Sequence, residues 1–444
     1  MDKKSALQII EEAIRLGADE AEIFAKRAKS LNIEVKDCKI DALDTSLTSG
    51  YGLRIIKDRR IGFAYSSGAE TASETVKKAL EAAAYTEQDD ANCLPDPSEY
   101  RQVAVFDPAV ATITDDEAIN AAVSIELAAK EYDSRIKKIR KAAAGFTTSQ
   151  TLIVNSKGIA AEFESTGCSG YITAIAEANN ENQMAWDYQG SRYLKNVSFE
   201  SIGRNAALKA VQLLNSRKIQ PMKGFVLIDS SVAVDFIEIL ASALSAEAVQ
   251  KQRSFLGGKT GELVADQKIN IIDNGLIDER LGSRPFDDEG VPVSRQYIIE
   301  EGVLNGFFHN SRSAKRDNTS STGNAVRGGF SALPSIGPSN MYLEPTTDEY
   351  RRSFNKLIRV MGRGLYVTET MGMHTANPVT GDFSVGASGL WIESGEIIHP
   401  AKEAMISGSI LTLFKNIVMV GDDLRFYGNI GSPSLLIDEI DITG

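Results

Sequence analysis

Apolar residues recur along the N-terminal half of the chain with two spacings, one typical of helices and one typical of strands. Leu7, Ile10 and Ile14 lie three and four positions apart, which predicts a helix over residues 4–16. Apolar residues then occupy every second position in four short stretches between residues 21 and 65. This alternation predicts an antiparallel meander of four strands behind the first helix.

The same order of elements returns farther along the chain. Thr71 and Glu74, and later Thr114 and Glu117, form two capping boxes, each of which predicts the start of a helix. Four strand-like stretches follow between residues 136 and 175, and a closing helix carries the next apolar stripe. We therefore interpret the N-terminal half as one α+β domain, residues 1–218, with a possible duplication of a helix, four strands and a helix in residues 1–90 and 112–218. The alternative is two unrelated α+β stretches that share this order by chance.

A different pattern begins at Lys223. A long helix is predicted from Ser231, and glycine-rich sequence with many short strand-like stretches follows it. This spacing is typical of a closed or strongly curved antiparallel sheet. A further helix is expected over residues 405–416. The fold class is thus α+β, with a second, barrel-like domain in residues 219–444.

Composition limits the classes of function. The 444 residues include 43% hydrophobic and 24% charged residues, which is ordinary for a globular protein. The formal charge is −12 and no long cationic block is present, so a general nucleic-acid binder is excluded. Three scattered cysteines indicate a reducing compartment. The sequence shows neither a signal-peptide pattern nor a stretch long enough to span a membrane, so we expect a cytoplasmic protein without membrane contact.

Common catalytic motifs are missing. The three histidines, His309, His374 and His399, show none of the close spacings with which a zinc hydrolase draws two ligands from one helix. Of the three, His374 lies in the loop of most unusual composition and is the best functional candidate. Cys168 falls within a strand pattern, which favours a packed thiol over a nucleophile.

Several blocks in the C-terminal half occur in a distinctive order. They are Gly-Met-His-Thr-Ala-Asn-Pro-Val-Thr-Gly-Asp-Phe-Ser at 372–384, Gly-Leu-Trp-Ile-Glu-Ser-Gly-Glu at 389–396, Val-Gly-Asp-Asp-Leu at 420–424 and Gly-Ser-Pro-Ser-Leu at 431–435. Together with residues 17–22 and 50–54, they resemble the TldD/PmbA family, a peptidase family of the U62 type related to the "modulator of DNA gyrase" proteins. The resemblance covers essentially the whole chain, and it points to the PmbA branch, also called TldE.

The resemblance implies a cytosolic metalloprotease in which a TldD-type subunit pairs with a PmbA/TldE-type subunit. In the TldD branch, a His-Glu-x-x-x-His motif on the long helix of the C-terminal domain and a cysteine in a later loop hold zinc. Aligning this chain places residues 246–251 on the motif. Only Glu247 matches, because Ala246 and Lys251 stand at the two histidine positions and the loop from Asp423 to Pro433 contains no cysteine.

The resemblance therefore implies no catalytic residue, no metal ligand and no cofactor in this chain, with zinc expected in a TldD-type partner. We expect Glu247 and Lys251 to form an exposed helical ion pair worth roughly 0.2–0.5 kcal/mol. The chain is predicted to be the non-catalytic half of a protease that acts on unstructured peptides. His374, Thr375, Asn377 and Asp382 are candidate peptide-binding residues, although a purely structural loop explains their composition equally well.

Two other functions stay open at this point. The chain could form a homodimer with its own non-standard peptidase site, built on His374, Asp382 and Glu393. It could also modulate DNA gyrase, as the family's older name implies. The charge of −12 argues against contact with DNA but leaves binding to the protein open.

Overall fold

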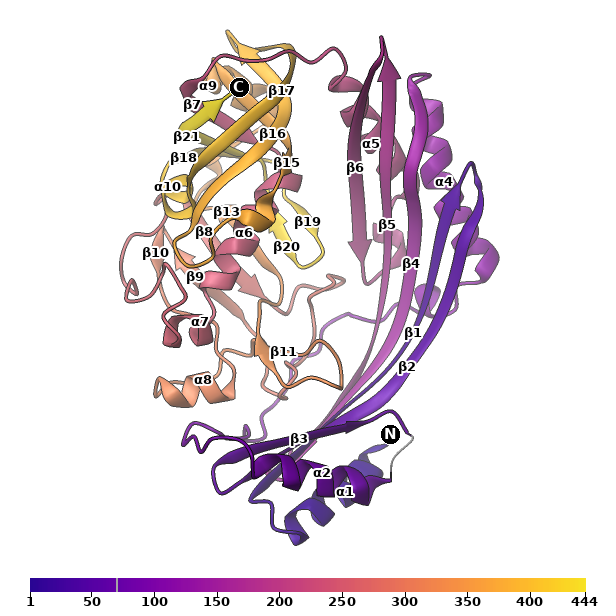
Figure 1. Ribbon diagram of the computed structural model, residues 1–444, viewed down its shortest axis with the longest axis vertical. Helices are drawn as coiled ribbons and strands as arrows, with labels where there is room; N and C mark the ends of the chain where they lie inside the picture. The colour runs from indigo at the N-terminus through magenta and orange to yellow at the C-terminus, as the bar shows by residue number, and fades with distance from the viewer. Residues whose placement is uncertain (69–70) are drawn as a thin grey trace.

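The computed structural model describes residues 1–68 and 71–444 and shows an α+β protein (Figure 1). A long, twisted sheet forms from the N-terminal half, and the C-terminal half packs beside it. The N-terminal elements are α1 (Lys3–Arg15), β1 (Glu20–Lys36), β2 (Lys39–Lys57), β3 (Arg60–Ser66), α2 (Ala72–Ala83), α3 (Pro108–Ala111), α4 (Asp115–Tyr132), β4 (Ile136–Asn155), β5 (Ala160–Ala178), β6 (Glu181–Ser191), η1 (Leu194–Asn196) and α5 (Phe199–Gln212).

The six N-terminal strands form one antiparallel sheet in the order β3-β2-β1-β4-β5-β6. Helix, three strands and helix occur twice, and β1 and β4 join the two halves at the centre. The prediction of four strands in each half was wrong, because residues 21–25 and 31–35 belong to one strand, as do residues 136–142 and 151–154. Both β1 and β4 have a partner on each side, which keeps the backbone extended through their polar middles.

Both predicted capping boxes are confirmed. The Thr71 hydroxyl accepts a hydrogen bond from the backbone N–H of Glu74, and the Glu74 carboxylate accepts one from the N–H of Thr71. Thr114 and Glu117 make the same reciprocal pair at the start of α4. Each box satisfies two backbone donors that a helix start leaves unpaired.

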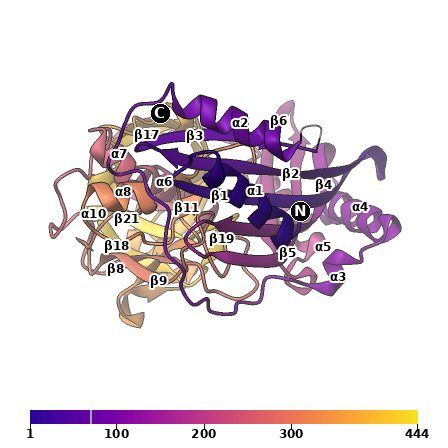
Figure 2. The same cartoon turned by 90° about the horizontal axis from the view of Figure 1, so that it is seen from below.

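The helices cover two ends of the sheet. α1 and α2 enclose a core with the lower end of β1 and β2, whereas α3, α4 and α5 enclose a second core with the other end of β1, β4 and β5. Figure 2, seen from below, shows α1 and α2 across one end of the sheet and α4 at a distance from them. A band of sheet between the two cores therefore carries no helix.

The C-terminal half begins after the segment that links α5 to β7, within which the predicted division at residues 218/219 falls. Its elements are β7 (Met222–Ile228), α6 (Ser230–Ala243), α7 (Ala246–Gln250), β8 (Ile269–Asn274), β9 (Arg295–Glu300), β10 (Val303–Leu304), α8 (Ser311–Arg316), β11 (Ala325–Val326), β12 (Ser335–Ile336), β13 (Met341–Pro345), η2 (Asp348–Tyr350), β14 (Arg351–Arg352), α9 (Phe354–Met361), β15 (Gly364–Met371), η3 (Met373–Thr375), β16 (Asp382–Glu393), β17 (Glu396–Ser409), α10 (Ile410–Lys415), β18 (Ile417–Gly421), β19 (Arg425–Tyr427), β20 (Ile430–Ser432) and β21 (Leu435–Thr443).

The predicted barrel-like sheet is confirmed. Strands β7, β15, β16, β17 and β21 close on themselves because β21 pairs with both β17 and β7. A second sheet, β10-β9-β8-β13-β20-β19, lies beside this barrel. Helix α6 joins them, and its Phe236 ring meets Phe383 of β16 edge to face with the centroids 5.0 Å apart.

The helix expected over residues 405–416 was wrong in its first half. Residues 405–409 continue β17, where Met405 and Ile406 pair with Thr443 and Ile442 of β21. The helix α10 begins only after Ser409, whose hydroxyl accepts a hydrogen bond from the N–H of Thr412. A strand partner more than thirty positions away in sequence thus outweighs the local helical pattern.

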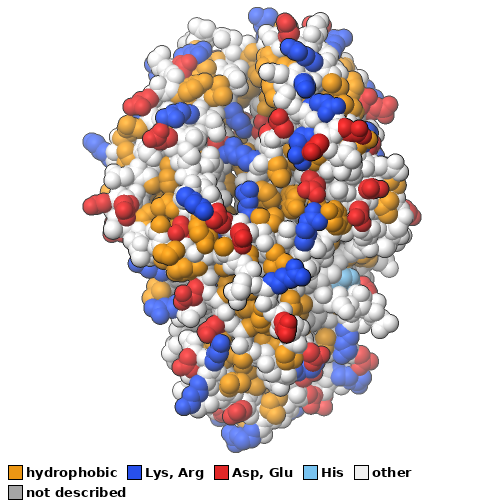
Figure 3. All heavy atoms as spheres, turned by 180° about the vertical axis from the view of Figure 1, so that it is seen from behind, with side chains coloured by type: hydrophobic (Ala, Val, Ile, Leu, Met, Phe, Trp, Pro, Cys, Tyr) orange, Lys and Arg blue, Asp and Glu red, His pale blue; other side chains and the backbone are white. Residues whose placement is uncertain are grey.

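Within the described part of the chain, every helix is too short or too polar to cross a lipid bilayer. Figure 3 shows one face of the molecule, on which acidic and basic side chains are interspersed and no broad basic patch forms. This distribution agrees with the negative net charge.

Candidate functional site

The sequence predicts that the segment aligned with the zinc motif lies on the long helix. In the structure it does not. Helix α6 ends at Ala243, and residues 246–250 form the separate short helix α7. The backbone turns away between them because Phe308 donates a hydrogen bond to the carbonyl of Leu244 and accepts one from the N–H of Ala246.

Glu247 and Lys251 form the predicted ion pair. The Nζ of Lys251 lies 2.5 Å from Oε1 of Glu247, and both side chains are about half exposed to solvent. Ala246 is buried and offers only a methyl group. The third ligand position also lacks a thiolate, since residues 423–433 contain no cysteine.

This donor set does not fit zinc. A methyl group cannot coordinate a metal, and an ammonium group repels a divalent cation. Among residues 1–68 and 71–444, no three His, Cys, Asp or Glu side chains come close enough together to hold a metal ion. Glu247 therefore has no metal-bound water to activate.

A cavity of about 210 Å³ opens beside Glu247, between the C-terminal half and the end of the N-terminal sheet. The helices α7 and α8 form one wall, and strands β2 and β3 contribute the opposite one. Its lining is mainly polar and basic: Arg54, Ile61, Glu247, Gln250, Asn310, Arg312, Ser313, Arg316, Leu333 and Pro334. The pocket therefore places the segment aligned with the zinc motif beside the boundary between the two halves.

A buried ionic network lies behind this cavity and joins the two halves of the chain. Arg54 of β2 donates hydrogen bonds of 2.7 Å to Glu22 of β1 and to Glu289 in the C-terminal half. Arg327 also pairs with Glu22, and all four side chains are almost completely buried. Glu289 accepts a further hydrogen bond from the N–H of Ser311 at the start of α8.

The charges of this network stabilise one another. Burial by itself lowers the pKa of Arg54, but Glu22 and Glu289 offset it and raise the pKa above its ordinary value. Burial raises the pKa of Glu289, whereas Arg54 and Ser311 lower it, and the lowering dominates. Arg54 and Glu289 therefore stay charged at neutral pH, and their pair is an ionic clamp between the halves rather than a proton carrier.

The loop 372–384 holds the four candidate peptide-binding residues at the surface. The side-chain Oδ1 of Asn377 accepts hydrogen bonds from the N–H groups of Val379 and Thr380. Thr375 donates to the carbonyl of Gly372, and Asp382 accepts from the Thr380 hydroxyl. Thus Asn377, Thr375 and Asp382 hold the loop itself, and only the exposed His374 keeps a side chain without a partner inside the loop.

The structure does not bring Asp382 and Glu393 together. They occupy the two ends of β16, a strand of 12 residues. At about 3.3 Å per residue the two backbones lie roughly 35 Å apart. A peptidase site built jointly from His374, Asp382 and Glu393 is therefore incompatible with this fold.

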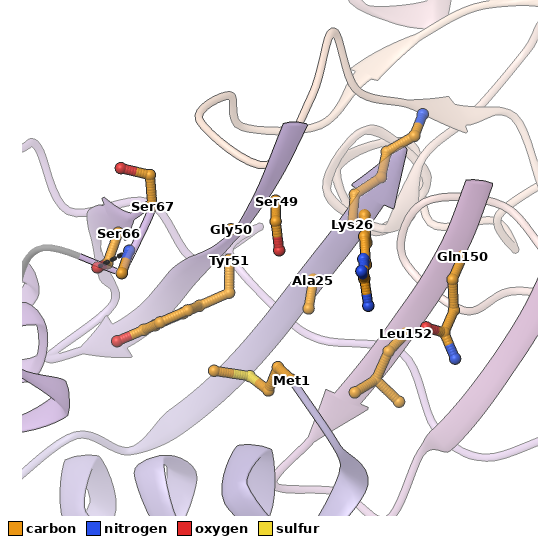
Figure 4. Close-up of a pocket in the computed structure, with 12 residues that line it drawn as sticks. Met1, Ala25, Lys26, Ser49, Gly50, Tyr51, Ser66, Ser67, Gln150 and Leu152 are labelled. Atoms are coloured by element: carbon orange, nitrogen blue, oxygen red, sulfur yellow. Dashed lines mark hydrogen bonds between the residues drawn. The ribbon is translucent and has the colours of Figure 1, made fainter. Parts of the chain in front are cut away.

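Another hollow, of about 230 Å³, lies on the N-terminal sheet (Figure 4). Its walls carry hydroxyl, amide and methyl groups from β1, β2, β3 and β4, with Lys26 and Arg27 as the charged residues. The Tyr51 hydroxyl at its edge donates a hydrogen bond to Thr75. No nucleophile is paired with a general base here, so this hollow offers no hydrolytic chemistry.

Comparison with known proteins assigns the whole chain. Three family models match in order: the PmbA/TldA metallopeptidase domain 1 over residues 21–84, the central domain over residues 108–214 and the C-terminal domain over residues 221–444. The chain belongs to the PmbA/TldD metallopeptidase family.

Individual relatives agree. The PmbA homolog of Haemophilus influenzae, a metalloprotease, is 30% identical over 98% of this chain and 94% of its own length. A Thermotoga maritima protein that bears the name of a DNA gyrase modulator matches with a TM-score of 0.91 and 28% identity over 99% of both chains. TldE from Thermococcus kodakarensis matches with a TM-score of 0.89 and 25% identity, again over 99% of both chains.

Two of the sequence blocks that indicated the family hold each other in place. Asp423 accepts hydrogen bonds from the N–H and the hydroxyl of Ser434, at 2.8 and 2.6 Å. Gly421 donates to the carbonyl of Ser434, and a Cβ at Gly421 would lie 2.0 Å from the Asp423 carboxylate. These contacts give the Gly-Asp-Asp and Ser-Pro-Ser blocks a structural role.

Cys168 is a packed thiol, as its strand position predicts. It is 2% exposed in β5, and burial followed by Asp107 raises its pKa to about 12. The ionic network was missed at the sequence level, although one signal was present: Arg54 is the one charged residue of the stretch 50–56, and its neighbours on both sides are apolar.

Proposed function

We propose that this chain is the non-catalytic, PmbA/TldE-type subunit of a cytoplasmic protease that acts on unstructured peptides, with a TldD-type subunit supplying the zinc. The observation that carries the proposal is the ligand position itself. A buried methyl group, an ion-paired ammonium and a loop without cysteine replace the three zinc ligands.

The same position explains why Glu247 does not act alone as a base. Its carboxylate is half exposed and already paired with Lys251. A general base of this type acts on a metal-polarised water, and the methyl and ammonium groups at the ligand positions cannot hold the metal. Hydrolysis then depends on the partner, while this chain contributes surface and shape.

Peptide binding by this chain is proposed for the loop 372–384. Extended peptides bind mainly through backbone hydrogen bonds, with a few side chains setting preference. His374 is the one candidate whose side chain is not occupied by the loop, so it is proposed to contact the peptide. Thr375, Asn377 and Asp382 would act by holding the loop in shape.

Zinc content and peptide cleavage test the assignment together. We expect the purified chain to contain no stoichiometric zinc and to leave an unstructured peptide intact, and we expect cleavage after a TldD-type subunit is added. In that mixture Glu247→Gln should leave the rate unchanged, whereas the same change in the partner's His-Glu-x-x-x-His motif should abolish it. Chelator-sensitive cleavage by this chain alone contradicts the proposal.

The loop is tested in the active mixture. His374→Ala should raise KM several-fold with little change in kcat, because uniform binding and not transition-state stabilisation is removed. His399→Ala serves as the matched control, since His399 lies in β17 and its ring contacts its neighbour Pro400. Equal KM values for both variants would remove the loop from the binding site.

A further inference from the structure

The cavity beside Glu247 contains hydrogen-bond donors that the chain itself does not use. Asn310 is only 6% exposed, and its Oδ1 accepts a hydrogen bond from the N–H of Ser313 at the start of α8. This cap leaves Nδ2 as the end of the amide that faces the cavity, and within the described part of the chain Nδ2 donates to no acceptor. Arg54 is 4% exposed, lines the same cavity, and has a buried Nε without a partner. Because buried donors normally have acceptors, these groups indicate a ligand with acceptor oxygens.

The wall formed by α7 and α8 carries an excess of positive charge. Arg312 and Arg316 both bind the Oδ2 of Asp89, so two guanidinium groups share a single carboxylate. Glu247 in the same lining is already matched by Lys251. One positive charge of this wall is therefore unmatched, which suits a singly charged anion better than a doubly charged phosphate.

The remaining lining of the cavity is apolar. Ile61 of β3, Leu333 and Pro334 contribute it, and Leu333 is 42% exposed. The volume of about 210 Å³ is smaller than the roughly 300–1,000 Å³ of pockets that enclose whole small-molecule ligands. The cavity is thus suited to one residue of a longer ligand, with an apolar stem on one side and a negative charge on the other.

We propose that this cavity binds a carboxylate of an unstructured peptide, with Asn310, Arg312 and Arg316 as the donors. For the class of ligand, an unstructured peptide, this inference rests on the proposed function. Guanidinium and amide groups match the two oxygens of a carboxylate in geometry and charge. An acidic side chain and a peptide C-terminus both present a carboxylate on an apolar stem, and the experiment below separates these two sources.

A short stretch of chain connects this cavity to the loop 372–384. Helix α7 lines the cavity through Glu247 and Gln250. Phe255 follows α7 and packs against the loop, since a Cβ at Gly381 would lie 3.2 Å from the Phe255 ring. Backbone hydrogen bonds alone do not distinguish one peptide from another. A carboxylate site next to the loop would give the subunit a preference for acidic residues or for chain ends.

Calorimetric titration of the full-length chain tests the ligand. The probes are three N-acetylated Gly/Ser peptides that end in Leu. The first has an internal Glu and an amidated C-terminus, the second an internal Gln and a free C-terminus, and the third an internal Gln and an amidated C-terminus. We expect the first or the second to bind at least ~10-fold more tightly than the third, because only these two can form charge-assisted hydrogen bonds. The tighter of the two identifies the source. Equal dissociation constants for all three, or no binding, overturn the proposal.

Removing the two arginines tests the site. Arg312→Met with Arg316→Met should weaken binding of the carboxylate peptide at least ~10-fold and leave the neutral peptide unchanged. Arg295→Met with Arg351→Met is the matched control. It changes the net charge equally, and its arginines are 40% and 45% exposed, against 44% and 39% for the tested pair. Equal losses in both double variants would mean that the overall charge and not the cavity attracts the peptide, which contradicts the proposal.

Asn310→Asp tests the site without removing the helix cap. Aspartate keeps an oxygen that accepts the hydrogen bond from the N–H of Ser313, so the variant should fold, as far-ultraviolet circular dichroism checks. It replaces the free donor by a charged acceptor, which repels a carboxylate. We expect binding of the carboxylate peptide to weaken at least ~10-fold. Unchanged binding by the folded variant overturns the role of Asn310 and with it the site.

The failure of this proposal and the failure of the proposed function are distinguishable. The titrations need neither zinc nor cleavage, so chelator-sensitive cleavage by this chain alone contradicts the non-catalytic assignment but leaves the measured peptide preference as it is. Two further results would overturn the carboxylate site. One is inorganic phosphate competing more strongly than acetate at equal ionic strength, and the other is a TldD-type subunit that abolishes peptide binding by covering the cavity.

Discussion

Strands β2 and β5 hold equivalent places in the two halves of the N-terminal sheet, yet the parts that extend beyond their outer partners have different neighbours. Each extends beyond its outer partner, β2 beyond β3 and β5 beyond β6. In the extra part of β5, residues 160–167, the N–H of Thr166 donates a hydrogen bond to the carbonyl of Val105. Among residues 1–68 and 71–444, no such backbone bond reaches residues 39–50 of β2. The repeated unit therefore builds the same edge twice, and what packs on it differs.

The cover on β5 comes from the long segment between α2 and α3. Its residues also reach the C-terminal half, where Tyr100 donates to the carbonyl of Gly290 and Ala104 to Asp278. β5 lies beside β6, which contacts the C-terminal half through Asp187 and Arg425, whereas β2 reaches that half where it pairs with β3, at Arg54 and Glu289. Position in the sheet, and not strand sequence alone, therefore determines what packs on each strand.

The largest contrast is expected between two arginines of the sheet. Arg54→Met in the part of β2 that pairs with β3 should lower the free energy of unfolding by about 3–5 kcal/mol, because Glu289 is left buried without an arginine and Glu22 keeps only Arg327. Arg27→Met on exposed sheet should change it by less than about 0.5 kcal/mol. Urea denaturation measures both. Similar losses would mean that the network does not clamp the halves.

The next largest effect is expected in the rates at which a thiol reagent labels Cys168 and Cys38. With its pKa raised from 9.0 to about 12, Cys168 should react with a disulfide reagent at pH 8 at least ~10³-fold more slowly than an ordinary thiol, and faster as the pH rises. Cys38, in the turn between β1 and β2, is partly exposed and should react first. Cys38→Ser identifies its signal. Labelling of Cys168 as fast as Cys38 contradicts a closed β5 side.

The smallest effect is expected from removing the Thr166 hydroxyl of β5, which binds the segment between α2 and α3. Thr166 accepts a hydrogen bond from the N–H of Asp107 and donates one to the carbonyl of Arg192. Thr166→Val leaves both groups unpaired and should cost about 2 kcal/mol in thermal or urea unfolding. Thr48→Val, in the part of β2 that does not pair with β3, is its matched control and should cost under about 0.5 kcal/mol. If the two losses are equal, the cover contributes nothing to β5.

Local signals explain which parts of the fold the sequence predicted. Capping boxes, the turn at residues 155–158 and the first helix depend on neighbours within four residues, and the structure confirms all of them. The middle of β4, around Gly145, is small and polar and becomes a strand only because β1 and β5 flank it. No local window contains that information.

The candidate site divides in the same way. Missing zinc ligands can be read directly from residues 246–251, so the exposed pair of Glu247 and Lys251 was predictable. The ionic network was not, because Arg54 and Glu289 are 235 positions apart in sequence. The inability of Asp382 and Glu393 to share a site follows from β16 running unbroken between them, although the sequence predicts only short strands there.

The closed barrel has a consequence for how the protein is made. Its first strand, β7, finds its neighbour β21 only after about 200 further residues have been synthesised, and this pairing is what closes the sheet. While the ribosome is still translating the C-terminal half, β7 has no β21 beside it and α6 exposes its apolar side. The N-terminal sheet can form on the nascent chain, but the barrel must wait for the last strand to leave the exit tunnel, and until then it is a client for chaperones.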